Sequence, residues 1–231
     1  MQLKRIPLSD LELDFHQKLF DGLVRDRGIL GGVVRPSELN LLVEIYKAIK
    51  PPRSIEWGLG TGVSAVALGK ARQALGLSGK HIVLDPFQKK FSDDQGLKCL
   101  AEFSALDCVE FYPITSEEYL VKARLRNESF DFVFIDGAHD MGHKLMDACL
   151  ASDVLSQNAI ICFHDSFFTS TSLALTYLVE EHGMKLIETG AESKLRRQLR
   201  GLKHARRLGS KFAIHYAPKI DFSLSCLTKG G

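Results

Sequence analysis

The sequence lacks the features that mark secreted and membrane-spanning proteins. Its five cysteines are odd in number, scattered, and include no C-x-x-C pair, which argues against a disulfide framework and favours a reducing compartment. The N-terminus has no uninterrupted apolar core of a signal peptide, and no stretch approaches the roughly 20 apolar residues of a membrane span. We therefore expect a cytoplasmic protein with no membrane span.

A strong charge excess is also missing. The formal net charge of +2 neither favours nor excludes nucleic acid as a partner. A length of 231 residues with 45% hydrophobic and 25% charged residues is ordinary for one globular domain. We expect this domain over residues 36–231, with residues 1–35 as a helical extension that forms a lid or a dimer contact.

Short apolar runs alternate with helical patterns along most of the chain. The runs fall at residues 53–57, 81–85, 109–113, 130–136, 159–165, 185–189 and 211–217, and helices are expected near 9–26, 36–50, 62–76, 93–106, 115–126, 140–155 and 170–182. Several runs are apolar on both faces, as strands buried between helix layers should be. The alternation predicts an α/β fold with a doubly wound sheet. A basic segment replaces the last crossover helix, so we expect an antiparallel last strand.

Three glycines at alternate positions follow the first apolar run, where residues 56–64 read EWGLGTGVS. In an open α/β sheet ligands bind beyond the carboxyl ends of the strands, and glycines let the backbone approach them. A tight turn without a ligand is the alternative. A nicotinamide fingerprint would need glycine in place of Val63, and a P-loop would need a following G-K-[ST], so the sequence disfavours both.

The pattern E-x-G-x-G-x-G, with Asp85 ending the second apolar run, resembles the class I S-adenosylmethionine-dependent methyltransferases. The resemblance covers about residues 31–217 and implies a Rossmann-like, seven-stranded sheet, mostly parallel with an antiparallel last strand. It also implies that Glu56 lies near the amino group of the cofactor, that Ser64 contacts its carboxylate, and that Asp85 binds both ribose hydroxyls. Ser116 matches the place where the adenine edge is held, although a helix cap explains it equally well. The implied cofactor contacts are Glu56, Gly58, Gly60, Thr61, Gly62, Ser64, Asp85, Ser116 and Asp136.

The end of the fourth apolar run resembles a narrower group, the O-methyltransferases of the catechol and caffeoyl-coenzyme A type and related bacterial enzymes with I-D-G-x-H. By this resemblance Asp136 and Asp165 match metal-binding carboxylates, and His139 matches the catalytic lysine. Two carboxylates can hold Mg²⁺, which lowers the pKa of an acceptor hydroxyl, and a histidine can remove its proton near neutral pH.

The match to this group also departs at Ser166, so the use of a metal stays open. Ser166 stands where the pattern has an asparagine ligand, and a serine hydroxyl is a poorer ligand. His164 is an alternative ligand, although imidazole favours zinc, iron or manganese over magnesium. Without a metal, Asp136 and Asp165 would cap helices or hold the cofactor.

A basic excursion is expected over residues 191–211, and its part 194–211 has eight lysines and arginines and no acid. It forms a solvated loop, contacts an anionic acceptor, or binds RNA through phosphates. The leading prediction is an enzyme that methylates a small, hydroxylated acceptor. An RNA methyltransferase and a catalytically silent, cofactor-binding subunit are the alternatives.

Overall fold

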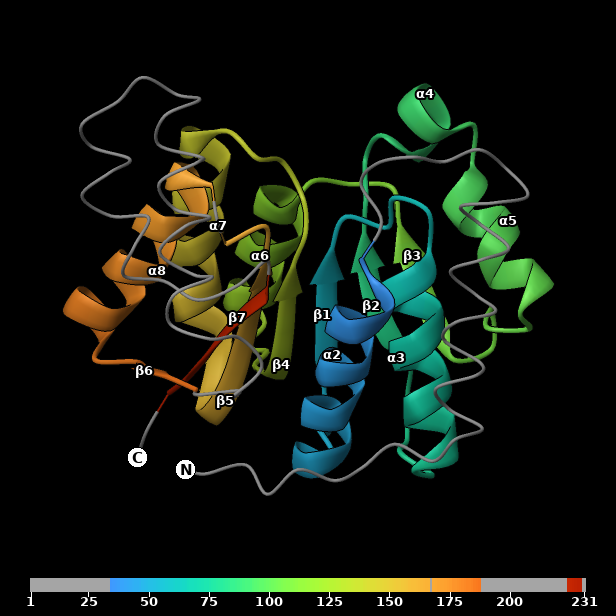
Figure 1. Cartoon of the computed structure of the whole chain (residues 1–231), viewed down its shortest axis with the longest axis horizontal. Coiled ribbons are helices and arrows are strands. Elements are labelled where there is room, and N and C mark those ends of the chain that lie inside the picture. The colour runs from blue at the N-terminus through green and yellow to red at the C-terminus, as the bar shows by residue number, and fades with distance from the viewer. Residues whose placement is uncertain (1–33, 167, 188–223, 230–231) are drawn as a thin grey trace. The chain divides into compact units, whose positions relative to one another are not determined.

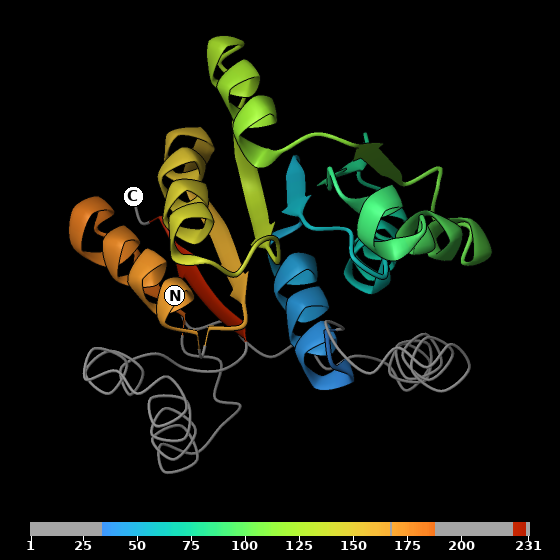
Figure 2. The same ribbon diagram turned by 90° about the horizontal axis from the view of Figure 1, so that it is seen from above.

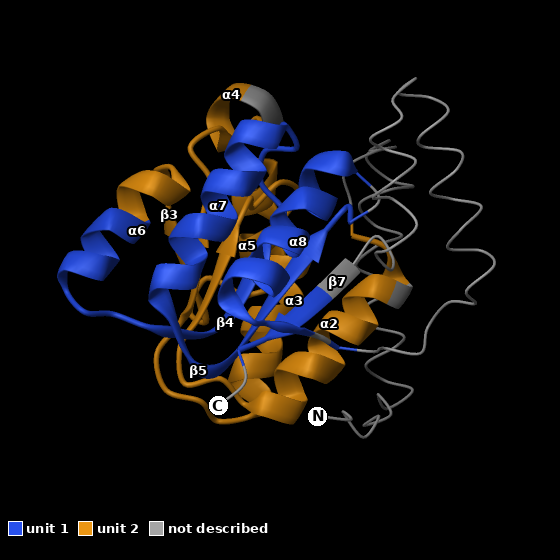
Figure 3. Cartoon of the chain, turned by 90° about the vertical axis from the view of Figure 1, so that its left-hand side faces the viewer, with its two compact units in different colours: residues 1–2, 120–231 blue, residues 3–119 orange. Residues whose placement is uncertain are grey.

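A computed structural model describes residues 34–166, 168–187 and 224–229. The expected N-terminal helix, the basic segment 194–211 and the expected strand over 211–217 all lie outside these residues. The chain groups into two compact units, residues 3–119 (unit 2) and residues 1–2 with 120–231 (unit 1), which Figure 3 colours separately. Within the described residues, no helix has the length and apolar character needed to cross a membrane.

Unit 2 is a parallel sheet with helices (Figure 1). Its elements are α2 (Pro36–Ile49), β1 (Ser54–Trp57), α3 (Val63–Ala74), β2 (His81–Leu84), α4 (Gln88–Ser92), α5 (Gln95–Glu102) and β3 (Val109–Tyr112). The strands lie in the order β3-β2-β1 and are parallel, with Ile55 opposite Ile82 and His81 opposite Val109. The carboxyl ends of β1 and β2 therefore lie at the same edge of this sheet, where the residues that follow them can meet.

Unit 1 is a mixed sheet with its own helices. Its elements are α6 (Ser116–Leu125, which begins in unit 2), β4 (Phe130–Ile135), α7 (Met141–Val154), β5 (Leu155–His164), α8 (Thr169–His182), β6 (Lys185–Leu186) and β7 (Leu224–Thr228). The order is β4-β5-β7-β6; β4 and β5 are parallel, whereas β7 is antiparallel to both of its neighbours. Helices α7 and α8 pack side by side (Figure 2).

The core explains why these runs form strands. All four residues of β1 are buried, and in β4 the side chains of Phe130, Phe132 and Phe134 are fully buried. Burying one such side chain contributes roughly 1.5–3 kcal/mol, which offsets the cost of ordering the chain. Helix α2 begins with Pro36, and the Glu38 side chain accepts a hydrogen bond from the backbone N–H of Arg35 at 3.0 Å, which closes its first turn.

The predicted fold class is confirmed: an α/β fold, mostly parallel, with an antiparallel last strand. A single sheet of seven strands stays a prediction, as does the division into residues 1–35 and 36–231. The structure adds a strand that the sequence did not indicate, β7 at residues 224–228, whereas the strand expected over 211–217 lies outside the described residues. Its buried Cys226 and Leu227 are adjacent and lie between the polar residues Ser225 and Thr228, in a run too short to stand out. In the strand register Cys226 lies opposite the buried Cys162 of β5, and both thiols are free. These cysteines therefore act as small core residues.

Candidate functional site

The glycine loop of unit 2 connects β1 to α3. Gly58, Gly60 and Gly62 all have positive φ, at 93°, 49° and 86°. A Cβ on Gly62 would lie 2.8 Å from the carbonyl oxygen of Gly96 in α5, so no side chain fits there. Backbone conformation therefore favours glycine at all three positions, and close packing also requires it at Gly62.

Asp85 follows β2 and faces this loop. Its Oδ2 atom accepts hydrogen bonds from the backbone N–H of Leu59 at 3.2 Å and of Gly60 at 3.1 Å, and its Oδ1 atom accepts one from Phe87 N–H at 2.8 Å. A carboxylate can accept about four hydrogen bonds. Asp85 thus holds the loop with one oxygen and the start of the next turn with the other.

Gln88 is a second residue that holds the loop, and the sequence did not indicate it. Its buried side-chain amide donates to Asp85 Oδ2 at 2.7 Å and to the Gly60 carbonyl at 2.9 Å, while its Oε1 atom accepts from Gly96 N–H at 3.1 Å. Its position three residues after Asp85 is the only signal in the sequence. Gln88 therefore joins Asp85, the loop and α5 into one hydrogen-bonded group.

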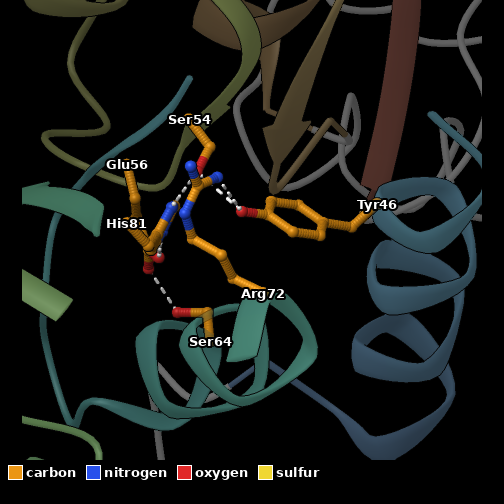
Figure 4. Close-up of polar contacts among 6 residues, drawn as sticks. All are labelled: Tyr46, Ser54, Glu56, Ser64, Arg72 and His81. Carbon is orange, nitrogen blue, oxygen red and sulfur yellow. Dashed lines mark hydrogen bonds and ion pairs between the residues drawn. The ribbon is translucent and has the colours of Figure 1, made fainter. Parts of the chain in front are cut away.

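The other predicted cofactor residues lie as follows. Glu56 is fully buried at the end of β1, where its carboxylate accepts a hydrogen bond from the Ser64 hydroxyl and lies 3.0 Å from Nε2 of His81 (Figure 4). Thr61 lies in the loop and is half-buried. Ser116 is the first residue of α6, and its neighbour Thr115 accepts the N–H of Glu118 at 3.2 Å, so the cap belongs to Thr115. The predicted roles of these residues toward a cofactor stay predictions.

A second cluster of polar residues forms in unit 1, where two neighbouring parallel strands end. Asp136 follows β4 and Asp165 follows β5, and the register places Ile135 opposite Phe163. His164 joins the two carboxylates, because its Nδ1 atom lies 3.1 Å from Asp136 Oδ1 and 3.5 Å from Asp165 Oδ2. The structure thus brings together the three residues that the sequence predicted as candidate metal ligands.

His139 lies in the loop between β4 and α7, next to this cluster. Its Nε2 atom lies 3.6 Å from Asp165 Oδ2, and its side chain is 45% exposed. The imidazole stacks on the Phe168 ring with centroids 5.5 Å apart, and the Ser170 hydroxyl donates to the His139 carbonyl at 2.7 Å. These contacts orient the ring while leaving it accessible.

The cluster offers ligands that fit a divalent cation. One ligand atom each from Asp136, His139 and Asp165 lies within 4.8 Å of the others. Two carboxylates and an imidazole suit manganese, iron or zinc better than magnesium. His164, the ligand predicted from sequence, is not in this group of three, although its Nδ1 atom faces both carboxylates.

The electrostatics of the cluster keep Asp165 ionised. Burial raises the pKa of Asp165, but the hydrogen bond and charge of His164, with the charges of His139 and Lys144, lower it below its ordinary value. Lys144 is a fully buried residue of α7 whose Nζ atom has no hydrogen-bond partner among the described residues. Burial lowers its pKa, against the opposing effect of Asp136 and other carboxylates.

Asp165 also has an uncommon backbone conformation. Its φ of 54° is positive, which non-glycine residues rarely adopt outside turns. The Phe168 N–H donates to the Asp165 carbonyl at 2.9 Å and closes the turn that holds it. A strained residue in a cluster of charged groups is typical of a functional site.

Comparison with known proteins covers the part of the chain that holds both polar clusters. Residues 55–166, which include the glycine loop, Asp85 and the cluster of unit 1, match the family model of a methyltransferase domain. No curated protein matches the sequence.

Solved structures of methyltransferases share the fold. The O-methyltransferase TomG from Streptomyces achromogenes, in complex with SAM and involved in tomaymycin synthesis, is 16% identical, with a TM-score of 0.56 and coverage of 97% of this chain and 92% of that chain. An O-methyltransferase from Bacillus cereus in complex with SAH is 18% identical (TM-score 0.58, coverage 80% and 86%). Cofactor-bound Rv0187 from MTB is 19% identical (TM-score 0.59, coverage 77% and 82%). Residues 55–166 therefore match a methyltransferase domain, and the chain shares the fold of these solved structures.

Proposed function

We propose that the protein transfers a methyl group from S-adenosylmethionine to a hydroxyl oxygen of a small acceptor. The observation that carries the proposal is the Asp85 carboxylate, which faces the glycine loop and binds the N–H of Gly60 in a chain that matches a methyltransferase domain. Oδ1 of this carboxylate accepts one hydrogen bond among those described, from Phe87 N–H, so it can also accept one from a ribose hydroxyl. The O-methyltransferase titles of similar structures favour oxygen as the accepting atom.

The proposed cofactor contacts keep the roles that the resemblance implies. Glu56 lies near the amino group of the methionine part, Ser64 contacts its carboxylate, Asp85 binds the ribose, and Ser116 lies at the adenine. The glycines of the loop let the backbone lie against the cofactor. Burial of Glu56 keeps water away from its carboxylate and strengthens its interaction with a cationic amino group.

We assign removal of the acceptor proton to His139. A base must exchange its proton with the acceptor and with solvent, and the His139 side chain is 45% exposed whereas that of His164 is 7% exposed. Asp165, whose Oδ2 atom lies 3.6 Å from His139 Nε2, stabilises the imidazolium that forms. The methyl sulfonium is already electrophilic, so proton removal and alignment of the acceptor supply the catalysis.

Asp136 and Asp165, together with His164 or His139, would hold a divalent cation. When bound, such a cation would lower the pKa of the acceptor hydroxyl. A neutral imidazole has one lone pair, so His139 cannot be base and ligand at once. We assign it the role of base and leave the ligand role to His164, which is buried between the two carboxylates.

An experiment with a methyl-labelled cofactor tests the proposal. The protein is incubated with labelled S-adenosylmethionine and a set of catechols, phenols, sugars and RNA, and mass spectrometry locates the label. We expect label on a hydroxyl oxygen of at least one acceptor. Label on RNA would support the alternative enzyme class, and binding of the cofactor without transfer to any acceptor would support a silent subunit.

Homodimer formation and an anionic acceptor stay predictions.

A further inference from the structure

A chain of buried hydrogen bonds runs through unit 2 behind the glycine loop (Figure 4). The Tyr46 hydroxyl lies 2.7 Å from Ser54 Oγ, and Ser54 Oγ lies 2.9 Å from Nδ1 of His81. Nε2 of His81 lies 3.0 Å from Oε2 of Glu56. His81 and Glu56 are fully buried, so this histidine is not available to solvent.

A buried cation ends this chain on the side away from Glu56. Nη1 of Arg72 lies 3.3 Å from the Tyr46 hydroxyl, and the same guanidinium donates to the backbone carbonyls of Pro51 at 2.9 Å and Pro52 at 2.6 Å. Arg72 is 2% exposed, and these carbonyls hold it in place. The chain therefore links a buried guanidinium to a buried carboxylate through the side chains of Tyr46, Ser54 and His81.

The two ends limit the directions that the hydrogen bonds can take. A guanidinium only donates and an ionised carboxylate only accepts. Both ends are satisfied when Tyr46 donates to Ser54, Ser54 donates to Nδ1 of His81, and Nε2–H of His81 donates to Glu56. Burial raises the pKa of Tyr46 despite its hydrogen bonds to Ser54 and Arg72, so its phenol keeps the proton that it donates.

The chain ends at the residue that precedes the glycine loop. His81 holds Oε2 of Glu56, and Ser64, in the first turn of α3 beyond the loop, holds Oε1. The Glu56 carboxylate thus joins the strand before the loop to the helix after it. Its orientation depends on His81 from one side and on Ser64 from the other.

We propose that His81 is a positioning residue for cofactor binding, which as the neutral Nε2–H tautomer fixes the Glu56 carboxylate and with it the loop 58–62. The ligand named here rests on the proposed function. A preorganised carboxylate binds a cationic amino group without first having to be ordered, so loss of His81 lowers affinity for the cofactor.

Calorimetric titration with S-adenosylmethionine tests this role. We expect His81→Leu to weaken binding about tenfold or more, because a buried hydrogen bond to a charged group is lost. His81→Gln places an amide N–H near the position of Nε2, and we expect it to restore affinity to within about threefold of the wild type. Equal affinity of His81→Leu and wild type would overturn the proposal.

A matched control separates positioning from general loss of stability. Val83 is a fully buried residue of the same strand, and Val83→Ala removes core volume without touching the hydrogen bonds. We expect it to lower the unfolding temperature and leave cofactor affinity unchanged. A loss of affinity equal to that of His81→Leu would assign the effect to stability and overturn the proposal.

The tautomer is measured without a ligand, by long-range proton–nitrogen NMR correlation on histidine-labelled protein. A proton on Nε2 alone supports the proposal, and a proton on Nδ1 overturns it. If the wild type does not bind S-adenosylmethionine, the proposed function fails and so does the ligand named here. If the wild type binds and His81→Leu binds equally well, only the role of His81 fails.

Discussion

Nε2 of His139 lies 3.6 Å from Oδ2 of Asp165, although 26 residues separate them in the sequence. The ends of β4 and β5 bring them together, because parallel neighbouring strands finish at the same edge of the sheet. The Phe168 ring stacks on the imidazole and fixes its plane. A histidine that is both oriented and accessible beside an ionised carboxylate is arranged to accept a proton.

His139→Ala should abolish most of the turnover and leave cofactor affinity intact. Loss of a general base lowers the rate about 10²–10⁴-fold. The measurement is the rate of S-adenosylhomocysteine formation together with calorimetric affinity for S-adenosylmethionine. His143→Ala is the matched control, since His143 is exposed and binds the helix cap Asp140 at 2.6 Å. Full turnover in His139→Ala would remove the base assignment.

Manganese should bind the cluster of unit 1. We expect a saturable change in the electron paramagnetic resonance of Mn²⁺ with the wild type and its loss in Asp136→Asn, since a carboxylate ligand is removed. Asp153→Asn serves as a control, because Asp153 pairs with Arg124 at 2.6 Å away from the cluster. Retained binding in His139→Ala together with loss in His164→Ala would support the assignment of ligand and base. The reverse pattern would contradict it.

Gly62→Ala should destabilise the protein more than Gly76→Ala. Both glycines have positive φ, 86° and 65°, but only at Gly62 would a Cβ meet backbone, at 2.8 Å from Gly96 O. We expect a loss of about 2 kcal/mol or more in the free energy of unfolding for Gly62→Ala, since strain and overpacking add. Gly76→Ala should lose about 1–2 kcal/mol from backbone strain alone. Urea denaturation compares the two variants. An equal loss in the free energy of unfolding would show that the loop moves to make room for the Cβ atom at position 62.

The buried Lys144 should make stability depend on alkaline pH. Burial lowers its pKa from the ordinary value of 10.5, so the unfolded state binds more protons between the two values. Stability attributable to this residue therefore rises as the pH approaches 10.5 from below. We expect the wild type to gain stability relative to Lys144→Met over this range, measured by denaturation at several pH values. Lys185 is exposed, so the stability of Lys185→Met should change with pH as that of the wild type does. If the stability of Lys144→Met also follows that of the wild type over this range, the prediction is contradicted.

Much of the fold was predictable because buried strands have a plain signature. The run FVFI is apolar on both faces, and it forms β4 with all four residues buried. The last strand was not predictable, since Leu224–Thr228 is short and mixed in character and takes its place by pairing with β5. Such pairing depends on residues distant in the sequence, which a local pattern does not record.

The candidate sites were predictable where a residue ends a strand. Asp85, Asp136 and Asp165 each follow an apolar run, and parallel strands bring such ends to one edge within each unit. Gln88 and His81 were missed, because a single polar residue in a sequence gives no sign that it will be buried. Their roles come from contacts with Asp85 and Glu56 that only the folded chain shows.

Calorimetric titration of the wild type and of Asp85→Ala with S-adenosylmethionine tests the central claim most directly. We predict saturable binding by the wild type and affinity lower by about tenfold or more in Asp85→Ala, since hydrogen bonds to a charged carboxylate are lost. Asp107→Ala, which removes an exposed carboxylate of the same unit, should bind as the wild type does. Absence of binding by the wild type, or equal affinity in Asp85→Ala, would contradict the account.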